Sequence, residues 1–579
     1  MAEAPTPDAE APGPDDLATR ASRGSPGGAP DAGDREGVRT PRDPSALIPV
    51  VLAAMLCWGL LAAGLSQLRR RTVPLMPDLW ETVLATSSAA HGAQRVGAWS
   101  RLGFFHPGPL WFYWAAPFYA ASGSKPASLP FAVAVLGAAC IVGIVVRTWR
   151  TADATAATVA VAILAIGVHQ LGIPGLVAPW NPTVLILPLA LGLVCTADAL
   201  ERGSVSSIAT AVLCGSFVAQ CHLGTFAIGG AVVLAALVGG LLRRRKLAAE
   251  GGPHLRARHW AVLAIALVVP WVPPLIDQVA GTGNLGSTAT YFRTGHGPAG
   301  SLEGIGANLT PGAALEQLGS IHSLSSSGIA SWAGVAVALG RDHEPTVAND
   351  ATFGILLALG LLGATRRRSP STGAAKLPEG IARGRQLGIQ LCRTSLVATA
   401  MFAISAVRIS SQFRPYLLAG AAGAGLALWL GVALVALAAA RSRFAGARAV
   451  VDLAATGLAA IVAIVIIATT STKVIGFGAD PEPTPTVAAI AAEAGDHGVI
   501  LAPAFEHSVP KSLKVAWELE RRGVRVGARG PFDDRFSDRQ RRFHDPEAIE
   551  VHVVTLTDEV PTGCDPVGAY GDATLCVVR

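Results

Sequence analysis

Two carboxylates and two nitrogen-containing side chains lie close together between residues 69 and 122. Asp78 and Glu81 are separated by less than one helical turn, and Arg101 and His106 follow in the same polar segment. A carboxylate can accept a proton from a hydroxyl group within hydrogen-bonding reach, and a guanidinium group pairs well with phosphate. The segment therefore has the residue types that general-base chemistry beside an anionic ligand requires.

The rest of the chain indicates that a membrane positions this segment. The 579 residues are 51% hydrophobic and 15% charged, with a mean hydropathy of +0.45. Soluble domains rarely have this composition, and roughly 20 apolar residues are enough to cross the hydrocarbon core of a bilayer. Many such runs, separated by arginine clusters, predict an α-helical polytopic membrane protein.

The arginine clusters indicate the orientation, because cytoplasmic loops carry an excess of Lys and Arg. The clusters that we place on the cytoplasmic side are 147–150, 243–246, 366–368 and 441–448. An even number of apolar runs lies between each cluster and the next. An even number is required because a chain segment that starts and ends on the cytoplasmic side must cross the membrane an even number of times. A last run at 449–470 crosses outward, which predicts about 11 transmembrane helices and an extracytoplasmic C-terminal part.

The N-terminal end leaves two topologies open. Arginines at 69–71 follow the first run, 46–68, and by themselves would place the next loop inside. A cytoplasmic N-terminus makes 109–122 a re-entrant or interfacial segment, whereas an external N-terminus makes it a span and raises the total to about 12. We favour the first topology because it avoids translocating a long charged tail, and because Pro109 and Pro117 interrupt the segment.

Three parts follow from this topology. Residues 1–44 are rich in Pro, Gly, Ala and charged side chains, which predicts a disordered cytoplasmic tail. Residues 45–472 form the transmembrane domain, with a first external loop at 69–127 and a long external loop at 277–349. Residues 473–579 form a small extracytoplasmic α/β domain.

The C-terminal part has the local patterns of a soluble domain. Thr484 and the proline after it are typical of a helix N-terminus and predict a helix that ends at Gly495. A second helix is expected at 511–521, with strands at 498–503 and 551–556.

Two of the eight cysteines differ from the rest. The other six lie in or beside apolar runs, where a thiol usually acts as a small apolar side chain. Cys564 and Cys576 bracket a Gly-containing turn of the last domain. On an oxidising exterior they could form a disulfide, and the alternative is two unpaired thiols.

Further polar residues fall on the same side of the membrane as Asp78 in this topology. They are Trp180, Asn181, Gln220, His222, Asp277, Gln278 and Arg414. Polar groups at membrane depth are costly and usually face a protein cavity. We therefore predict a pocket on the outer side for an anionic, hydroxylated ligand.

Each candidate also has a structural interpretation. Asp78 and Glu81 could be solvated charges in the first turn of a helix, where carboxylates stabilise the helix dipole. His106 and His222 could satisfy backbone groups. The sequence has no CxxC, HExxH, P-loop or GxSxG motif, so metal-hydrolase, ATPase and serine-hydrolase functions have no support. The net charge of +6 comes largely from arginines between spans and does not indicate nucleic-acid binding.

Several short motifs occur in a fixed order along the chain. They are Trp-Ser-Arg at 99–101 with Gly103, His-Pro-Gly-Pro-Leu at 106–110, Trp-Asn-Pro at 180–182, Gln-Cys-His-Leu-Gly at 220–224, and Trp-Val-Pro-Pro-Leu-Ile-Asp-Gln at 271–278. This ordered set resembles actinobacterial membrane proteins of the GT-C glycosyltransferase type over about residues 46–470. The resemblance implies that Asp78 is the catalytic base. The sequence departs from the family pattern because no adjacent Asp-Glu pair is present, and Glu81 is only an approximate substitute.

The function that the resemblance implies is inverting sugar transfer in cell wall biogenesis. A polyprenyl-phosphate sugar in the cell membrane would be the donor, and an external cell-envelope glycan, lipid or protein the acceptor. Arg101 and Arg414, with Arg69 as a further candidate, would stabilise the leaving phosphate. The other polar residues of the pocket would bind substrate. No cofactor is certain, and a divalent metal is possible.

Two other function classes stay open. A transporter or flippase of a lipid-linked or anionic solute would show paired repeats or corresponding broken helices, and the sequence shows no internal repeat. A non-catalytic envelope scaffold would keep its fold and tolerate the loss of Asp78.

The orientation can be tested with single cysteines. We expect an impermeant thiol reagent to label a cysteine near Gly295 or Ala494 in intact cells, and not one near Ser371, because the arginine clusters place only the last of these positions inside. Labelling at Ser371 without labelling at Gly295 would contradict the topology.

Overall fold

The computed structural model describes residues 47–74, 78–252, 254–294, 309–323, 346–365, 378–408, 413–472, 474, 476–478, 484–503, 505–555, 558 and 561–578. Several sequence-based predictions lie outside these residues. They are the N-terminal tail 1–44, the arginine cluster 366–368, the probe positions Gly295 and Ser371, and much of the long loop 277–349.

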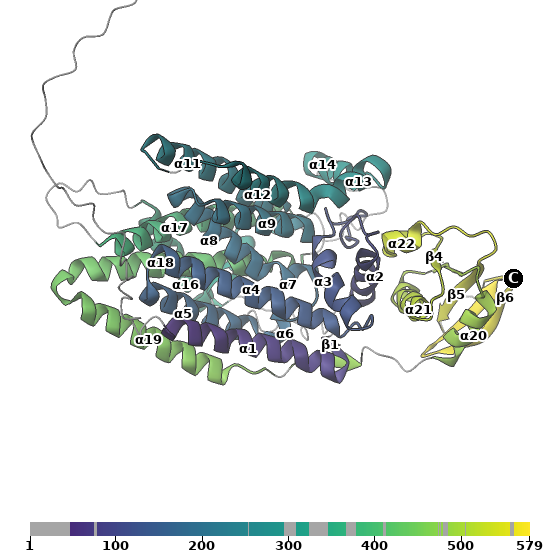
Figure 1. The fold of residues 1–579 in the computed structure, drawn as a ribbon. Helices are drawn as coiled ribbons and strands as arrows, with labels where there is room; N and C mark the ends of the chain where they lie inside the picture. The colour runs from purple at the N-terminus through teal and green to yellow at the C-terminus, as the bar shows by residue number, and fades with distance from the viewer. Residues whose placement is uncertain are drawn as a thin grey trace, which may run out of the picture. The chain divides into compact units, whose positions relative to one another are not determined.

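Ten helical segments within the described residues are long and apolar enough to cross a membrane (Figure 1). They are α1 (Leu47–Arg70), α4 (Ser128–Thr151), α5 (Ala154–Leu171), α7–α8 (Asn181–Arg202), α10–α11 (Leu223–Ala249), α12–α13 (Ala257–Ala280), α16 (Val347–Thr365), α17 (Glu379–Val407), α18 (Ala421–Arg443) and α19 with the turn before it (Ala445–Thr469). A shorter apolar helix, α9 (Val205–Cys221), coincides with the remaining predicted run. The predicted helical polytopic membrane fold is confirmed.

The first loop contains short elements only. β1 (Thr72–Pro74) is followed by α2 (Leu79–Ala90) and α3 (Leu110–Ala121). α3 has 12 residues and carries Pro117 in its interior, so it is too short to span a bilayer. This length fits the re-entrant or interfacial alternative, while the side of the membrane on which the loop lies stays a prediction.

Ion pairs of the buried Arg441 join helix ends near two of the arginine clusters. Arg441 at the end of α18 is 4% exposed and bonds Asp153 at 2.7 Å and Asp452 at 2.5 Å. Asp153 also caps α5 by accepting from the backbone N–H of Ala156. A buried charge is tolerated only when it is paired and hydrogen-bonded, so these contacts fix α5, α18 and α19 to one another.

The C-terminal part is a small mixed α/β domain, as predicted. Its strands are β3 (Val499–Leu501), β4 (Val526–Ala528), β5 (Ile549–Thr555), β6 (Cys564–Tyr570) and β7 (Ala573–Val578), in the sheet order β4-β3-β5-β7-β6. β3 pairs in parallel with β4 and β5, and β7 pairs antiparallel with β5 and β6. The helices α20 (Pro485–Ala494) and α21 (Val509–Arg521) agree with the two predicted helices (Figure 1). Sequence analysis missed β4, β6 and β7.

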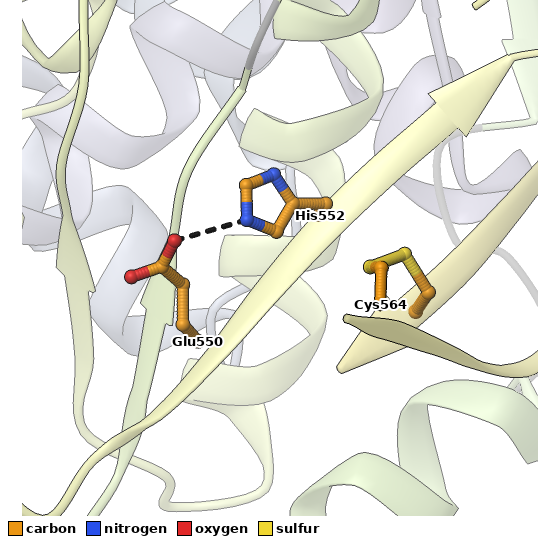
Figure 2. Close-up of a disulfide and its surroundings, with 4 residues drawn as sticks. Glu550, His552 and Cys564 are labelled. Carbon is orange, nitrogen blue, oxygen red and sulfur yellow. Dashed lines mark hydrogen bonds and ion pairs between the residues drawn. A yellow bond between two sulfur atoms is a disulfide. The ribbon is translucent and has the colours of Figure 1, made fainter. Parts of the chain in front are cut away.

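The last hairpin carries the disulfide, which joins Cys564 on β6 to Cys576 on β7 (Figure 2). Glu550 and His552 of the neighbouring strand β5 are hydrogen-bonded to each other at 2.9 Å. The remaining six cysteines are unpaired and lie in or next to the apolar helices.

Reduction of this disulfide should destabilise the C-terminal domain. The two cysteines are 12 positions apart, and in the chain-entropy model a loop of this length contributes on the order of 3 kcal/mol. We expect Cys564→Ser/Cys576→Ser protein to unfold at a lower denaturant concentration than the parental protein. Intact mass analysis of protein purified without reductant provides the control, and finding both thiols free would contradict the pairing.

Candidate functional site

A cavity of about 1050 Å³ lies where the first loop meets the membrane helices and the C-terminal domain. It brings together seven of the residues that the sequence singled out: Asp78, Glu81, Arg101, His106, Trp180, Asn181 and His222. The remaining walls come from the start of α10, the end of α17, the helix α14 (Asn284–Thr294) and residues 531–535.

The two carboxylates occupy the first turn of α2. Asp78 is the N-cap residue, and its Oδ2 accepts a hydrogen bond of 2.9 Å from the indole N–H of Trp180. Glu81 is only 8% exposed, and its Oε1 accepts a hydrogen bond from the backbone N–H of Trp99. Glu81 is therefore not a solvated surface charge, and Asp78 is held by Trp180, the residue that directly precedes α7.

The two carboxyl groups differ in how tightly they hold a proton. Burial raises the pKa of Asp78, while the Trp180 hydrogen bond and the charge of Arg535 oppose the shift. Burial, reinforced by the negative charge of Asp78, raises the pKa of Glu81 to about 8. Glu81 therefore holds its proton more tightly than an ordinary carboxyl group, whereas the Trp180 hydrogen bond and the charge of Arg535 favour the ionised form of Asp78.

The indole ring of Trp180, which donates the hydrogen bond to Asp78, is held by an aromatic contact. The rings of Trp180 and Tyr416 lie 4.7 Å apart, centroid to centroid. Tyr416 belongs to the short helix η5 (Pro415–Leu418), directly after Arg414. The turn before α18 thus orients the indole that binds the carboxylate.

His106 and His222 form a second pair in the cavity wall, with ring centroids 4.9 Å apart. The Nδ1 of His106 accepts from the backbone N–H of Leu223 at 3.1 Å, and the Nδ1 of His222 accepts from the N–H of Gly224 at 3.2 Å. A neutral imidazole whose Nδ1 is an acceptor carries its proton on Nε2.

Both histidines are neutral near physiological pH. Burial and the neighbouring His222 hold the pKa of His106 well below its usual range, and burial with the charge of Arg101 lowers the pKa of His222 to about 4. Each ring therefore satisfies a backbone group through Nδ1, as the structural interpretation expected, and keeps its Nε2–H as a donor.

Four predicted substrate-binding residues do not line the cavity: Gln220, Asp277, Gln278 and Arg414, which directly precedes η5. Gln220 is fully buried and donates to the carbonyl oxygen of Pro270 at 2.7 Å. Asp277 accepts from the backbone N–H of Thr282 and of Asn284, at 2.9 and 3.1 Å. Gln278 accepts from Gly286 at 2.8 Å. Polar side chains at these helix ends satisfy backbone groups and thereby shape the loops around the cavity.

Asp277 nevertheless acts on the site through Asn284. The side chain of Asn284 accepts from the N–H of Phe105 at 3.0 Å and donates to the carbonyl oxygen of His106 at 3.2 Å. The carboxylate of Asp277 fixes the start of α14, and α14 in turn fixes the strand-like segment that carries His106.

Sequence analysis did not select several residues that line the cavity. Arg293 is cationic, and Glu506, Asp534 and Arg535 come from the C-terminal domain. Arg408 also lines the cavity, and the sequence places it after an apolar run, on the same predicted side of the membrane as Arg414. No local pattern marked the C-terminal residues. Among the described residues no group of three or more His, Cys, Asp or Glu side chains is arranged to hold a metal ion.

No protein-family model matches the sequence, and no match is found among curated proteins. Among solved structures, the chain is similar to ArnT from Cupriavidus metallidurans bound to undecaprenyl phosphate, with 13% identity, 92% of this chain and 98% of that chain covered, and a TM-score of 0.47. It is similar to the same protein in the apo state with 14% identity, the same coverage and a TM-score of 0.41.

The Archaeoglobus fulgidus oligosaccharyltransferase in complex with zinc and sulfate is also similar. The identity is 12%, with 82% of this chain and 61% of that chain covered, and the TM-score is 0.40. All three TM-scores lie below 0.5, so the chemistry of the site rests on its own residues.

The proton on Glu81 makes stability depend on pH. The pKa of Glu81 is raised to about 8 in the folded protein and is about 4.3 in an unfolded chain. Its contribution is fully present below the unfolded value and is lost as the pH rises through about 8. We expect the melting temperature of the purified protein to fall between about pH 5 and about pH 8 and to level off at higher pH, with a smaller fall in Glu81→Gln protein.

Glu316→Gln on the helix α15 (Pro311–His322) is a matched control, because Glu316 is exposed. This variant should keep the parental pH dependence. An unchanged fall in Glu81→Gln protein would show that Glu81 does not hold the proton.

Proposed function

We propose that the protein is an inverting membrane glycosyltransferase that moves a sugar from a polyprenyl-phosphate donor to an extracytoplasmic acceptor. The observation that carries the proposal is the pair of carboxyl groups of Asp78 and Glu81 in a cavity that several guanidinium groups also line. This arrangement supplies a base and positive charge for a leaving phosphate within one cavity.

The proposed reaction is a single displacement at the anomeric carbon. Asp78 accepts the proton of the acceptor hydroxyl as its oxygen attacks this carbon. The bond between the carbon and the phosphate oxygen breaks, and its electron pair leaves with the polyprenyl phosphate. Attack from the side opposite the leaving group inverts the configuration. Arg101 and Arg408 line the same cavity and would stabilise the charge on the phosphate.

The polarity of the cavity wall supports a lipid-linked donor. Ala227 and Ile228 on α10 and Met401 and Ile404 on α17 contribute an apolar side to a cavity whose other side is charged. Ile404 is 55% exposed, as expected of a residue that faces lipid in a membrane-spanning helix. An isoprenoid chain needs such a surface next to its phosphate group, whereas a free nucleotide sugar does not.

We place the cavity and the C-terminal domain on the extracytoplasmic side of the cell membrane, with the N-terminus inside. The arginine clusters support this orientation, and so does the disulfide, because disulfides persist in oxidising compartments. The acceptor would then be a cell-envelope glycan, lipid or protein.

Replacement of Asp78 tests the assignment of the base. Asp78→Asn keeps the shape of the side chain and removes its ability to accept the proton, so transfer from a polyprenyl-phosphate sugar should fall by roughly 10²- to 10⁴-fold. Transfer is measured with purified protein and radiolabelled donor. Comparison of the envelope glycans of a deletion strain, complemented with either form, extends the test to cells.

Glu81→Gln is the matched control for this experiment. An amide resembles the protonated carboxyl group in size and charge, so this variant should lose much less activity near neutral pH. Parental transfer by Asp78→Asn together with an inactive Glu81→Gln would move the base to Glu81. Parental transfer by both would remove the main support for an enzyme.

A further inference from the structure

The C-terminal domain is hydrogen-bonded to the first loop through Asp538, which is only 2% exposed. Its Oδ2 accepts from the backbone N–H of Arg95 at 2.6 Å and of Val96 at 3.3 Å. The backbone N–H of Asp538 donates to the side chain of Gln94 at 3.3 Å. Arg541 pairs with the same carboxylate at 2.5 Å, so the charge at this contact is compensated.

A second set of contacts fixes the domain to α2 and α3. The indole N–H of Trp517 on α21 donates to the hydroxyl oxygen of Tyr119 on α3 at 3.0 Å, and the ring of Trp517 lies 5.0 Å from that of Trp80 on α2. Glu520 accepts a hydrogen bond of 3.0 Å from Ser87. The domain is therefore held at three places on the loop that bears the carboxylates.

Arg535 lies in the sequence between Glu520 and Asp538, two of the residues that hold the domain on the first loop. It lines the same cavity as Asp78 and Glu81. It ends the short helix η8 (Asp533–Arg535), three positions before the buried Asp538. Its Nη1 is 4.0 Å from Glu506, and its Nε is buried without a hydrogen-bond partner among the described residues. The docking contacts thus bring a cation of the C-terminal domain to the carboxylate pair.

The charge of Arg535 acts on both carboxyl groups. It lowers the pKa of Asp78 and that of Glu81, against the effect of burial on each. Asp534, the residue before it, acts in the opposite direction on Glu81. Arg535 therefore favours the ionised form of a base in a site where burial favours the neutral form.

Other charged and titratable groups also line this cavity. The membrane-domain loops contribute Arg101, His106, His222, Arg293 and Arg408, with the phenol groups of Tyr291 and Tyr416. The C-terminal domain contributes Glu506 and Asp534. These groups are the same in the parental protein and in an Arg535 variant. A difference in pH dependence between the two proteins can therefore be assigned to Arg535.

We propose that Arg535 is a positioning residue of the transfer reaction: the docked C-terminal domain places its guanidinium group in the cavity that Asp78 lines, where its positive charge favours the carboxylate that acts as the base. This inference rests on the proposed function. The C-terminal domain then completes the active site and has more than a structural role, and its docking makes the transmembrane domain competent for transfer.

Substitution of Arg535 tests the proposal through the pH profile of transfer. In Arg535→Gln protein the acidic limb of kcat should move to higher pH by about one unit, a roughly tenfold loss on that limb. The rate should recover at alkaline pH. Arg535→Lys, which keeps the charge, should restore most of the parental profile. KM for the donor should change little, because the charge acts on the base.

Arg529→Gln is the matched control. Arg529 is 65% exposed, pairs with Glu550 at 3.3 Å on the same domain, and does not line the cavity. This variant should keep the parental profile. An equal loss for Arg535→Gln at every pH would mean that Arg535 only supports the fold, and a raised KM with an unmoved limb would mean that it binds the donor. Either result would overturn the proposal.

Infrared titration of the carboxyl groups separates this inference from the proposed function. The method needs no substrate, and Asp78→Asn and Glu81→Gln proteins assign the bands. If the parental enzyme is active and Arg535→Gln leaves the titration of Asp78 unchanged, the role of Arg535 is overturned and the proposed function is not. If the parental protein transfers no sugar but Arg535→Gln raises the pKa of Asp78, the proposed function is overturned and the effect of Arg535 on Asp78 remains.

Discussion

The placement of two carboxyl groups within one turn of α2, with Glu81 buried and Asp78 half-buried, is the constraint on which the rest of the site depends. An unpaired buried carboxylate costs several kcal/mol, and two like charges at this spacing oppose each other further. The protein meets the constraint in three ways: Glu81 keeps a proton, Trp180 donates to Asp78, and Arg535 supplies positive charge. These contributions come from three distant parts of the sequence, so the site exists only in the folded chain.

The loop between α2 and α3 shows how the chain builds around this pair. Residues 97–106 fold back on themselves, with hydrogen bonds from Gly97 N–H to the His106 carbonyl at 3.0 Å and from His106 N–H to the Ala98 carbonyl at 2.8 Å. One side of this hairpin presents the N–H of Trp99 to Glu81, and the other carries His106. A Cβ at Gly97 would lie 2.8 Å from the Cβ of His106, so only glycine allows the two sides to approach this closely.

Sequence patterns predicted the parts of the structure that depend on local composition. Apolar runs located the membrane helices, and Thr484 located the start of α20. The predicted topology placed seven residues that line the cavity on one side of the membrane. Segments that emerge on the same side share one surface, so these residues could be expected to lie together. The same rule included Gln220 and Asp277, which instead satisfy backbone groups, since helix ends and cavities both require polar side chains.

The contribution of the C-terminal domain could not be predicted in this way. Arg535 lies in a polar turn like many others, and its role depends on the docking of Asp538 and Trp517 against the first loop. The strands β4, β6 and β7 were missed for a related reason, because short or irregular strands form mainly through pairing with neighbours distant in sequence.

The histidine pair adds the last element of charge balance. Because both Nδ1 atoms accept from backbone N–H groups and both rings stay neutral, His106 and His222 offer donors without adding charge. Guanidinium groups alone then set the positive charge of the cavity. A transferase must stabilise a phosphate as it leaves and then release it. Further cations in the site would bind the phosphate product more tightly and slow its release, so the turnover rate would fall. In the proposed reaction, neutral donors beside a few arginines would meet both requirements.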